Sequence, residues 1–387
     1  METLMITQDN EQPKSTNFQT TIKLIKVTVG SGIFAMPYAY AQAGLWWGII
    51  LQLLVCTTQY SSWCIMVNCL GDRKRLTLIQ YLSQTYGENS FIYTLAKNMS
   101  IILNFGCGLS YIILFQITIG SYFEYSLQSQ IIIFVLLFII IFGFSFAQNL
   151  QIFVPILKQV LLIVYISFAY LSFLAIIELN KWKLTESNTD KVMIAFGIMI
   201  FAYDMNGVLT EIRIEMEDTS HFQKCLFEAM TLETILFMFF GITSSLLFQT
   251  NTNQSIITNY QEQFKHNYSI LITLSILMIT YVSILIINTL MVNMPFYLII
   301  NSIFNKKELY QMKIIYVLTQ MLIAFLYPNF AIVLSIFGCV CCVTLGYIIP
   351  YYMTFRFKVE PLNRIINTAV VLFGIFGGFY GLLGCFG

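Results

Sequence analysis

The chain has 387 residues, of which 58% are hydrophobic and 10% are charged, and its formal net charge at pH 7 is +1. Soluble globular domains carry about 25% charged residues, so this composition excludes a water-exposed surface of ordinary charge density and predicts one domain embedded in the lipid bilayer. The near-neutral charge provides no basic surface for nucleic acid, so we expect no nucleic-acid partner. We also expect the membrane protein to be a monomer.

The start of the chain differs from the rest because it is polar. It is rich in Gln, Asn, Asp and Glu and lacks the short apolar segment that precedes the cleavage site of a signal peptide. We therefore predict a cytosolic tail over residues 1–20, followed by a transmembrane domain over residues 21–387.

A membrane-spanning helix requires about 20 mostly apolar residues, and eleven such segments follow the tail. They cover residues 21–44, 46–70, 99–122, 130–148, 154–177, 191–212, 224–248, 268–300, 312–328, 330–355 and 364–386. The weakly apolar stretch 76–92 is predicted to form an interfacial helix. The fold class expected from this pattern is an all-α membrane protein with eleven transmembrane helices.

The positive charges agree with this arrangement when the N-terminus is placed in the cytosol. Of the 20 Lys and Arg residues, the opposite side of the membrane then receives only Lys181, Lys183, Lys191 and Lys265. This asymmetry is what the positive-inside rule requires. The glycosylation sequons at Asn253 and Asn267 fall in the loop after the seventh span, which the same arrangement places outside the cytosol.

The nine cysteines are predicted to be small packing residues. All lie in or beside apolar spans, so no extracellular disulfide is expected. Cys339, Cys341 and Cys342 are close together in the sequence, but a metal site requires further Cys or His ligands at suitable spacing. We expect neither a metal nor a cofactor apart from a coupling ion.

Two of the predicted spans contain residues that interrupt a helix. The first holds Gly30-Ser31-Gly32, where the glycines let the backbone leave helical geometry at low cost; close helix packing through small residues is the alternative. A carboxylate within a span costs about 2.5–3.5 kcal/mol on insertion scales, so Asp204 in the sixth span is a candidate functional residue, unless it lies at a helix end that water reaches. Its surroundings are Phe201-Ala202-Tyr203-Asp204-Met205-Asn206-Gly207.

The two interruptions are five spans apart, so the helices that contain them run in opposite directions. This pattern is typical of a five-plus-five inverted repeat, here with an eleventh span appended, in which paired discontinuous helices form the substrate site of a transporter. N–H groups at the first break can bind a carboxylate, and free carbonyls at the second can bind an ammonium, which together suit an amino acid. The predicted substrate-binding residues are Gly30, Ser31, Gly32, Ile33, Phe201, Ala202, Tyr203, Asp204 and Asn206.

The first span, TIKLIKVTVGSGIFAMPYAYAQAG, resembles the opening helix of the amino acid/auxin permease family, whose pattern is G-x-G-[IL]-L-x-[LM]-P-[YW]-A-[FY]-x-x-x-G. The sixth, FAYDMNGVLTEIRIEM, is similar to the family's F-x-F-E-G-x-G-V-V-L-P-x-E-N-E-M, but Met205 replaces a usual glycine and Glu211 a usual proline. Near the end, YPNFAIVLSIFGCVCCVTLGYIIPYY resembles the tenth span at Pro328, Gly338 and Pro350.

The resemblance covers residues 15–386 and implies a LeuT-like fold with cation-coupled movement of amino acids. In this family, sodium-coupled members tend to carry Asn where this chain has Lys26, whereas proton-coupled members tend to carry Lys. A lysine ammonium can take the place of Na⁺ beside the same carbonyls, although Lys26 could instead extend toward the cytosolic face.

Two further residues bear on the coupling ion. Asn288 and Thr289 in the eighth span could supply oxygen ligands to a hard cation, or could form interhelical hydrogen bonds. Asp204 is the alternative to Lys26 as a proton carrier, because burial disfavours the charged form of either side chain. We predict H⁺ rather than Na⁺ as the coupling ion.

The function predicted from these features is secondary active transport of neutral amino acids by alternating access, in the plasma membrane or in a vacuolar or lysosomal membrane. A Na⁺-coupled symporter and a non-transporting amino acid sensor of the same fold remain open alternatives. An enzyme is disfavoured because His221 and His266, the two histidines, lie in predicted loops rather than within a span.

The topology can be tested by glycosylation. Treatment with a glycosidase is expected to increase the protein's electrophoretic mobility, and Asn253→Gln should remove most of that shift because Asn253 lies on the non-cytosolic side. Asn267 is closer to the membrane and is expected to be modified less. Modification at Asn98, a sequon that the topology places in the cytosol, would overturn the assignment of eleven spans.

Overall fold

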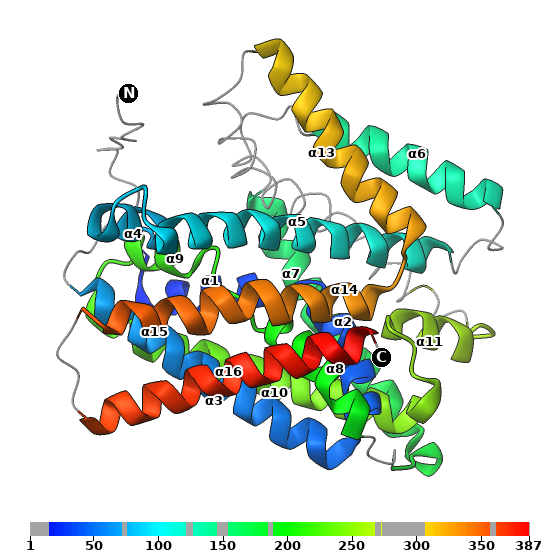
Figure 1. The fold of residues 1–387 in the computed structure, drawn as a ribbon. Coiled ribbons are helices and arrows are strands. Elements are labelled where there is room, and N and C mark those ends of the chain that lie inside the picture. The colour runs from blue at the N-terminus through cyan, green and yellow to red at the C-terminus, as the bar shows by residue number, and fades with distance from the viewer. Residues whose placement is uncertain are drawn as a thin grey trace.

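The computed structural model describes residues 15–71, 76–120, 127–144, 154–184, 189–267, 272, 306–356 and 361–386. Over these residues the chain is a bundle of helices (Figure 1). The only pairing of the β type among them is an isolated bridge between Ser15 and Met216. The predicted all-α class is therefore confirmed for the described part of the chain.

The helices follow the predicted order of spans. They are α1 (Asn17–Thr28), α2 (Gly32–Ala43), α3 (Leu45–Leu70), α4 (Leu78–Tyr86), α5 (Phe91–Gly120), α6 (Leu127–Phe144), α7 (Val154–Ile177), α8 (Thr189–Ala202), α9 (Leu209–Ile214), α10 (Phe222–Phe248), α11 (Ile256–Gln263), α13 (Lys306–Leu326), α14 (Phe330–Phe337), α15 (Ile349–Thr354) and α16 (Pro361–Phe386). Two π-helical segments, η5 (Gly338–Cys342) and η6 (Thr344–Ile348), join α14 to α15.

Within the described residues, five helical segments are long and apolar enough to cross a membrane. They are Leu45–Leu70, Phe91–Gly120, Thr219–Asn251, Phe330–Thr354 and Pro361–Phe386. The predicted eighth span, with Asn288 and Thr289, lies outside the described residues. The total of eleven spans and the five-plus-five repeat therefore remain predictions.

Two boundaries differ from the sequence-based prediction. The interfacial helix expected over residues 76–92 is α4, which ends at Tyr86 because Gly87 adopts a left-handed backbone conformation with φ of 88°. The third span then begins at Phe91 rather than at residue 99, and the Ser90 hydroxyl accepts a hydrogen bond from the Tyr93 N–H at its start. Helix α11, in the loop after the seventh span, was not predicted.

Large apolar side chains are exposed on several helices. A soluble monomer rarely exposes contiguous apolar surface beyond a few hundred Å², whereas these side chains suit contact with lipid. Examples are Trp46, Leu53 and Leu54 on α3, Ile131, Leu136 and Ile139 on α6, and Phe376, Phe379 and Leu383 on α16.

Four helices, α2, α3, α14 and α16, pack against α8, and Figure 1 shows α2 and α16 beside it. The contacts are close because glycine removes the side chain at each one. A Cβ atom on Gly32 of α2 would lie 2.6 Å from the Cα of Ala202. A Cβ on Gly338 would overlap the carbonyl of Gly197. A Cβ on Gly377 of α16 would overlap the ring of Phe196. Small residues allow this backbone approach, as is usual between membrane helices.

The packing of α8 can be tested by adding one methyl group. Gly338→Ala is expected to destabilise the protein by about 1–3 kcal/mol, the usual cost of overpacking, because the new Cβ meets the backbone carbonyl of Gly197, which cannot rotate away. Gly384→Ala is the matched control, since its Cβ would lie 3.3 Å from the Ile194 side chain and no closer than 3.5 Å to any other atom of its surroundings. Thermal melting in detergent is the measurement, and equal melting temperatures for the two variants would contradict the prediction.

Candidate functional site

The predicted break in the first span is present, between α1 and α2. Helix α1 ends at Thr28, and α2 begins at Gly32. The Gly30 N–H donates to the Thr28 carbonyl at 2.7 Å, which turns the chain out of the helix. The first N–H groups of a helix have no acceptor within that helix, and the N-cap residue Ser31 makes no side-chain capping bond. The N–H groups at the start of α2 therefore point toward potential acceptors outside it.

Helix α5 fixes the position of this first break. The Ser31 hydroxyl lies 2.8 Å from the Ser110 hydroxyl, and both side chains are buried. A Cβ atom on Gly30 would lie 2.7 Å from the Tyr111 hydroxyl, so the glycine allows the chain to pass close to that ring. Ser110 and Tyr111 were not predicted as site residues. A pair of adjacent polar residues within an apolar span was the only signal for them.

The predicted break in the sixth span is also present, between α8 and α9. Helix α8 ends at Ala202 and α9 begins at Leu209, so Tyr203 to Val208 leave the helix. The Asp204 Oδ1 accepts hydrogen bonds from the backbone N–H of Asn206, at 3.4 Å, and from its side-chain amide. Asp is favoured at such turns because its carboxylate can bond the backbone two residues ahead.

Asn206 connects this second break to α3. Its Oδ1 accepts a hydrogen bond from the Trp63 Nε1 at 2.9 Å, and both residues are buried. On the other side, a Cβ atom on Gly346 in η6 would lie 3.1 Å from the Asn206 Nδ2. The π-helical part of the tenth span therefore approaches the second break, which agrees with the frequent occurrence of π-helical turns at functional sites.

The Tyr203 side chain takes part in a hydrogen-bonded network that joins the second break to α2, α3 and α10. The Tyr40 hydroxyl donates to Gln52 Oε1 at 2.6 Å, and Gln52 Nε2 donates to the Tyr203 hydroxyl at 2.8 Å. The Tyr203 hydroxyl donates in turn to Thr234 Oγ1 at 2.9 Å. Gln52 and Thr234 were missed in the sequence analysis, although a buried amide in the second span was the available signal.

The two breaks lie against each other through Gly32 and Ala202. Gly30, Ser31 and Ile33 flank this contact on one side, and the second break continues directly from it on the other. The structure thus brings both halves of the predicted site together. It also gives Gly32 and Ala202 a packing role, because each fills the space beside the other.

The part of the sixth span that follows the second break is held by several elements. On α9, the Thr210 hydroxyl accepts a hydrogen bond from the Leu78 N–H at 3.1 Å, and Arg213 Nη2 donates to the Gly71 carbonyl at 2.8 Å. Lys23 of α1 pairs with Glu215 at 2.6 Å. The backbone of Ser15 forms hydrogen bonds with Glu215 and Glu217, so the start of the described chain lies on the same end.

The remaining predicted residues lie in different places. Lys26 is half-buried in the last turn of α1, where a positive charge complements the partial negative charge of a helix C-terminus. Asn288 and Thr289 fall outside the described residues. Asn253 is exposed between α10 and α11, with its Nδ2 donating to Thr258 Oγ1 at 3.1 Å, and Asn267 is exposed just after α11.

Cysteines surround one side of Asp204. Cys107 of α5 and Cys341 and Cys342 of η5 are near enough to interact electrostatically with its carboxylate. All three thiols are free. In the part of the chain that the structure describes, no group of three His, Cys, Asp or Glu side chains has the arrangement of a metal site.

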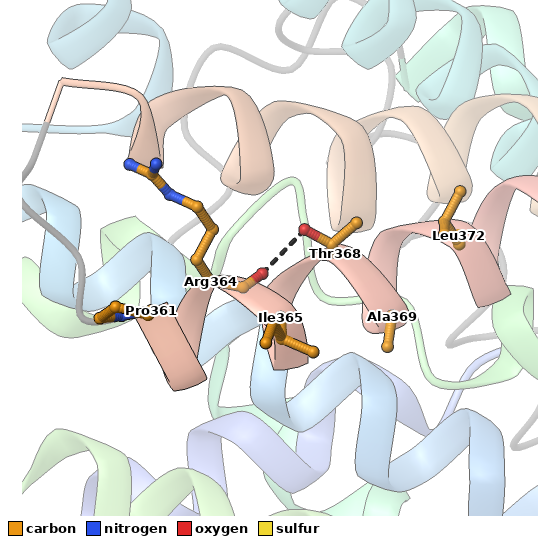
Figure 2. A pocket seen from close by; sticks show the side chains of 6 residues that line it. All are labelled: Pro361, Arg364, Ile365, Thr368, Ala369 and Leu372. Atoms are coloured by element: carbon orange, nitrogen blue, oxygen red, sulfur yellow. Dashed lines mark hydrogen bonds between the residues drawn. The ribbon is translucent and has the colours of Figure 1, made fainter.

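A surface hollow lies away from both breaks, along one face of α16. Figure 2 shows its lining, which comes from this helix alone, with the Thr368 hydroxyl donating to the Arg364 carbonyl at 2.8 Å. The other lining residues are Pro361, Ile365, Ala369 and Leu372. Their exposed apolar side chains suit lipid contact, and the hollow has no polar group from a second element to recognise a solute.

The chain is similar to known proteins in both sequence and fold. Amino acid transporter AVT3B of Arabidopsis thaliana is 22% identical over 395 residues, covering 96% of this chain and 93% of the relative. Vacuolar amino acid transporter 7 of Saccharomyces cerevisiae is 25% identical over 268 residues, covering 64% of this chain and 52% of the relative. The crystal structure of MhsT in complex with L-phenylalanine has a TM-score of 0.60 at 8% identity, covering 95% of this chain and 98% of MhsT.

The structural similarity shows a shared fold, and it agrees with the LeuT-like fold that the family resemblance implies. At family level, residues 13–386 match the family described as "Transmembrane amino acid transporter protein". This match spans nearly the whole chain and identifies a membrane transporter rather than an enzyme. The chain therefore belongs to the transmembrane amino acid transporter protein family.

Proposed function

We propose that the protein is a secondary active transporter of neutral amino acids, with the substrate bound between the two breaks. The observation that carries this proposal is the direct contact between Gly32 at the start of α2 and Ala202 at the end of α8. That contact places helix-terminal donors and helix-terminal acceptors side by side, and a zwitterion requires both.

The substrate carboxylate is assigned to the first break. The N–H groups of Ser31, Gly32 and Ile33 carry the partial positive charge of a helix N-terminus, and such ends bind anions. The substrate ammonium is assigned to the second break, where α8 ends with carbonyls that have no donor within the helix. The Asp204 carboxylate lies in the same segment. A zwitterionic amino acid without a charged side chain satisfies both ends.

The membrane and the ion are further parts of the proposal. The yeast relative is named as a vacuolar transporter, which favours an acidic internal compartment over the plasma membrane for this chain. A proton gradient exists across such a membrane, so we propose H⁺ coupling. Lys26 would take the position of a coupling Na⁺ beside the first break, and Asp204 is the alternative residue for carrying the proton.

Transport can be separated from sensing by counterflow. Purified protein in liposomes preloaded with one unlabelled amino acid is expected to accumulate the labelled form, and a screen over all amino acids should favour neutral ones. A non-transporting sensor would be stabilised against heat by an amino acid but would give no counterflow. That combination of results would replace the transport proposal.

The contact between the breaks provides a variant for the same assay. Gly32→Val is expected to reduce counterflow to the level of protein-free liposomes, because its side chain would force α2 away from Ala202 and separate the two halves of the site. The control is Gly384→Ala, which alters a glycine on α16 far from the breaks in sequence. Normal counterflow by Gly32→Val would remove this contact from the substrate site.

The ion can be identified by imposing one gradient at a time. An inward proton gradient is expected to raise accumulation above the equilibrium level, whereas an inward Na⁺ gradient at constant pH should not. Lys26→Ala should lower proton-driven accumulation more than counterflow, because it alters coupling more than substrate binding. If a Na⁺ gradient alone drives accumulation, the proton assignment is wrong, and Asn288 and Thr289 become the residues to test.

A further inference from the structure

Helix α10 carries a carboxylate in an unusual environment. Glu233 lies about three turns after the start of the helix and its exposed fraction is 1%. Neither carboxylate oxygen has a hydrogen-bond partner among the described residues. Burying an ionised carboxylate without a partner is far more costly than burying a neutral group. Glu233 therefore requires either a proton or a bound cation in this state.

The polar groups around Glu233 leave that requirement unmet. The Thr28 side chain lies beside the carboxylate, but its hydroxyl donates to the Ile25 carbonyl at 3.0 Å. Tyr165 of α7 is close enough to interact with Glu233 electrostatically, yet its hydroxyl also has no partner among the described residues. Among the described residues, Cys56 of α3 and Tyr203 of the second break also interact electrostatically with Glu233.

No described salt bridge compensates the charge. Lys23 of α1 pairs with Glu215. Lys26 and Thr28 are two residues apart on α1, about 200° around the helix axis, so their Cβ atoms lie on opposite sides of the helix. Neutralisation by a proton is therefore the simplest state that fits the structure.

Two other acidic residues show what distinguishes Glu233. Burial opposes the ionised form of Asp204 as well, but Asp204 accepts two hydrogen bonds from Asn206, which offset part of that effect. Glu228, on the same helix, is exposed and accepts a hydrogen bond from the Thr21 hydroxyl at 3.3 Å. Of these three carboxylates, Glu233 is the one that is buried and makes no hydrogen bond of normal geometry, with only the Thr28 hydroxyl beside it to support a negative charge.

We propose that Glu233 binds the coupling proton. A proton from the outer or lumenal compartment adds to a carboxylate oxygen and forms a neutral acid, and the O–H bond breaks when the proton leaves to the cytosol. Thr28 is the last residue of α1, directly before the first break, so a shift of α1 at that break would change the access of water to Glu233. This inference rests on the proposed transport function.

Substrate-induced proton flux into proteoliposomes tests the proposal. Glu233→Gln, which cannot exchange a proton, is expected to lose this flux and to lose proton-driven accumulation, while counterflow falls by less. Glu233→Asp should retain measurable flux because it keeps the acid. Glu228→Gln makes the same chemical change at an exposed position of α10 and should behave as wild type. The assignment would be overturned if Glu233→Gln retained the wild-type proton flux. It would also be overturned if Asp204→Asn lost the flux while Glu233→Gln kept it.

A second measurement does not depend on transport. Infrared difference spectra of the purified protein between acidic and alkaline buffer should contain a carbonyl band of protonated Glu233 among those of the other acids, and it should appear in the double difference between wild type and Glu233→Gln but not in that between wild type and Glu228→Gln. The elution volume and melting temperature of the variant in detergent establish that it is folded. If wild type shows no counterflow but retains this band, the transport function fails while the proton site stands. If the band is absent, or if Glu233→Gln abolishes a Na⁺-driven accumulation instead, the proton site is wrong.

Discussion

The backbone contacts of α8 constrain the rest of the bundle. Glycines on α2, η5 and α16 let these segments approach α8 without an intervening side chain at the contact point. Such approach leaves little freedom for α8 to move alone. The chain can change direction only where α8 ends, and there it leaves helical geometry from Tyr203 to Val208. In an apolar environment the backbone groups freed in this way require partners, so the break becomes a polar site by necessity.

The partners found at the two breaks differ in kind. At the second break, Asn206 bonds to Asp204 and accepts a hydrogen bond from Trp63. The Tyr203 hydroxyl forms hydrogen bonds with Gln52 and Thr234. These bonds fix the segment in one geometry. At the first break, the donors of α2 have no acceptor within their helix. In the proposed site, internal hydrogen bonds thus hold the Tyr203 and Asn206 side chains of the second break in position, while the donors of the first break are suited to exchange their partner, as binding and release require.

The positions of both breaks could be predicted from the sequence because their cause is local. Gly30 and Gly32 remove side chains from a span, and Asp204 and Asn206 place turn-forming polar groups in another. The start of α5 was misplaced because polar residues such as Lys97 and Asn98 suggested a loop, whereas they continue the helix that begins at Phe91. The roles of Gln52, Thr234 and Glu233 depend on neighbours far away in the chain, and a single sequence does not reveal such pairs. Gly32 shows a mixed result, since its position was predicted but its contact with Ala202 was not.

The attachment of α9 has a consequence for the speed of the protein. In the proposed transport cycle, opening at this end of the bundle would move this short helix away from Leu78 and Gly71, and so break the bonds that involve Thr210 and Arg213 together. A single hydrogen bond contributes about 0.5–1.5 kcal/mol net, but about 4–6 kcal/mol before solvent replaces it. The transition state for opening passes through the stage in which these bonds are broken and water has not yet entered. The turnover rate of such a protein should therefore rise steeply with temperature, reflecting a large activation enthalpy.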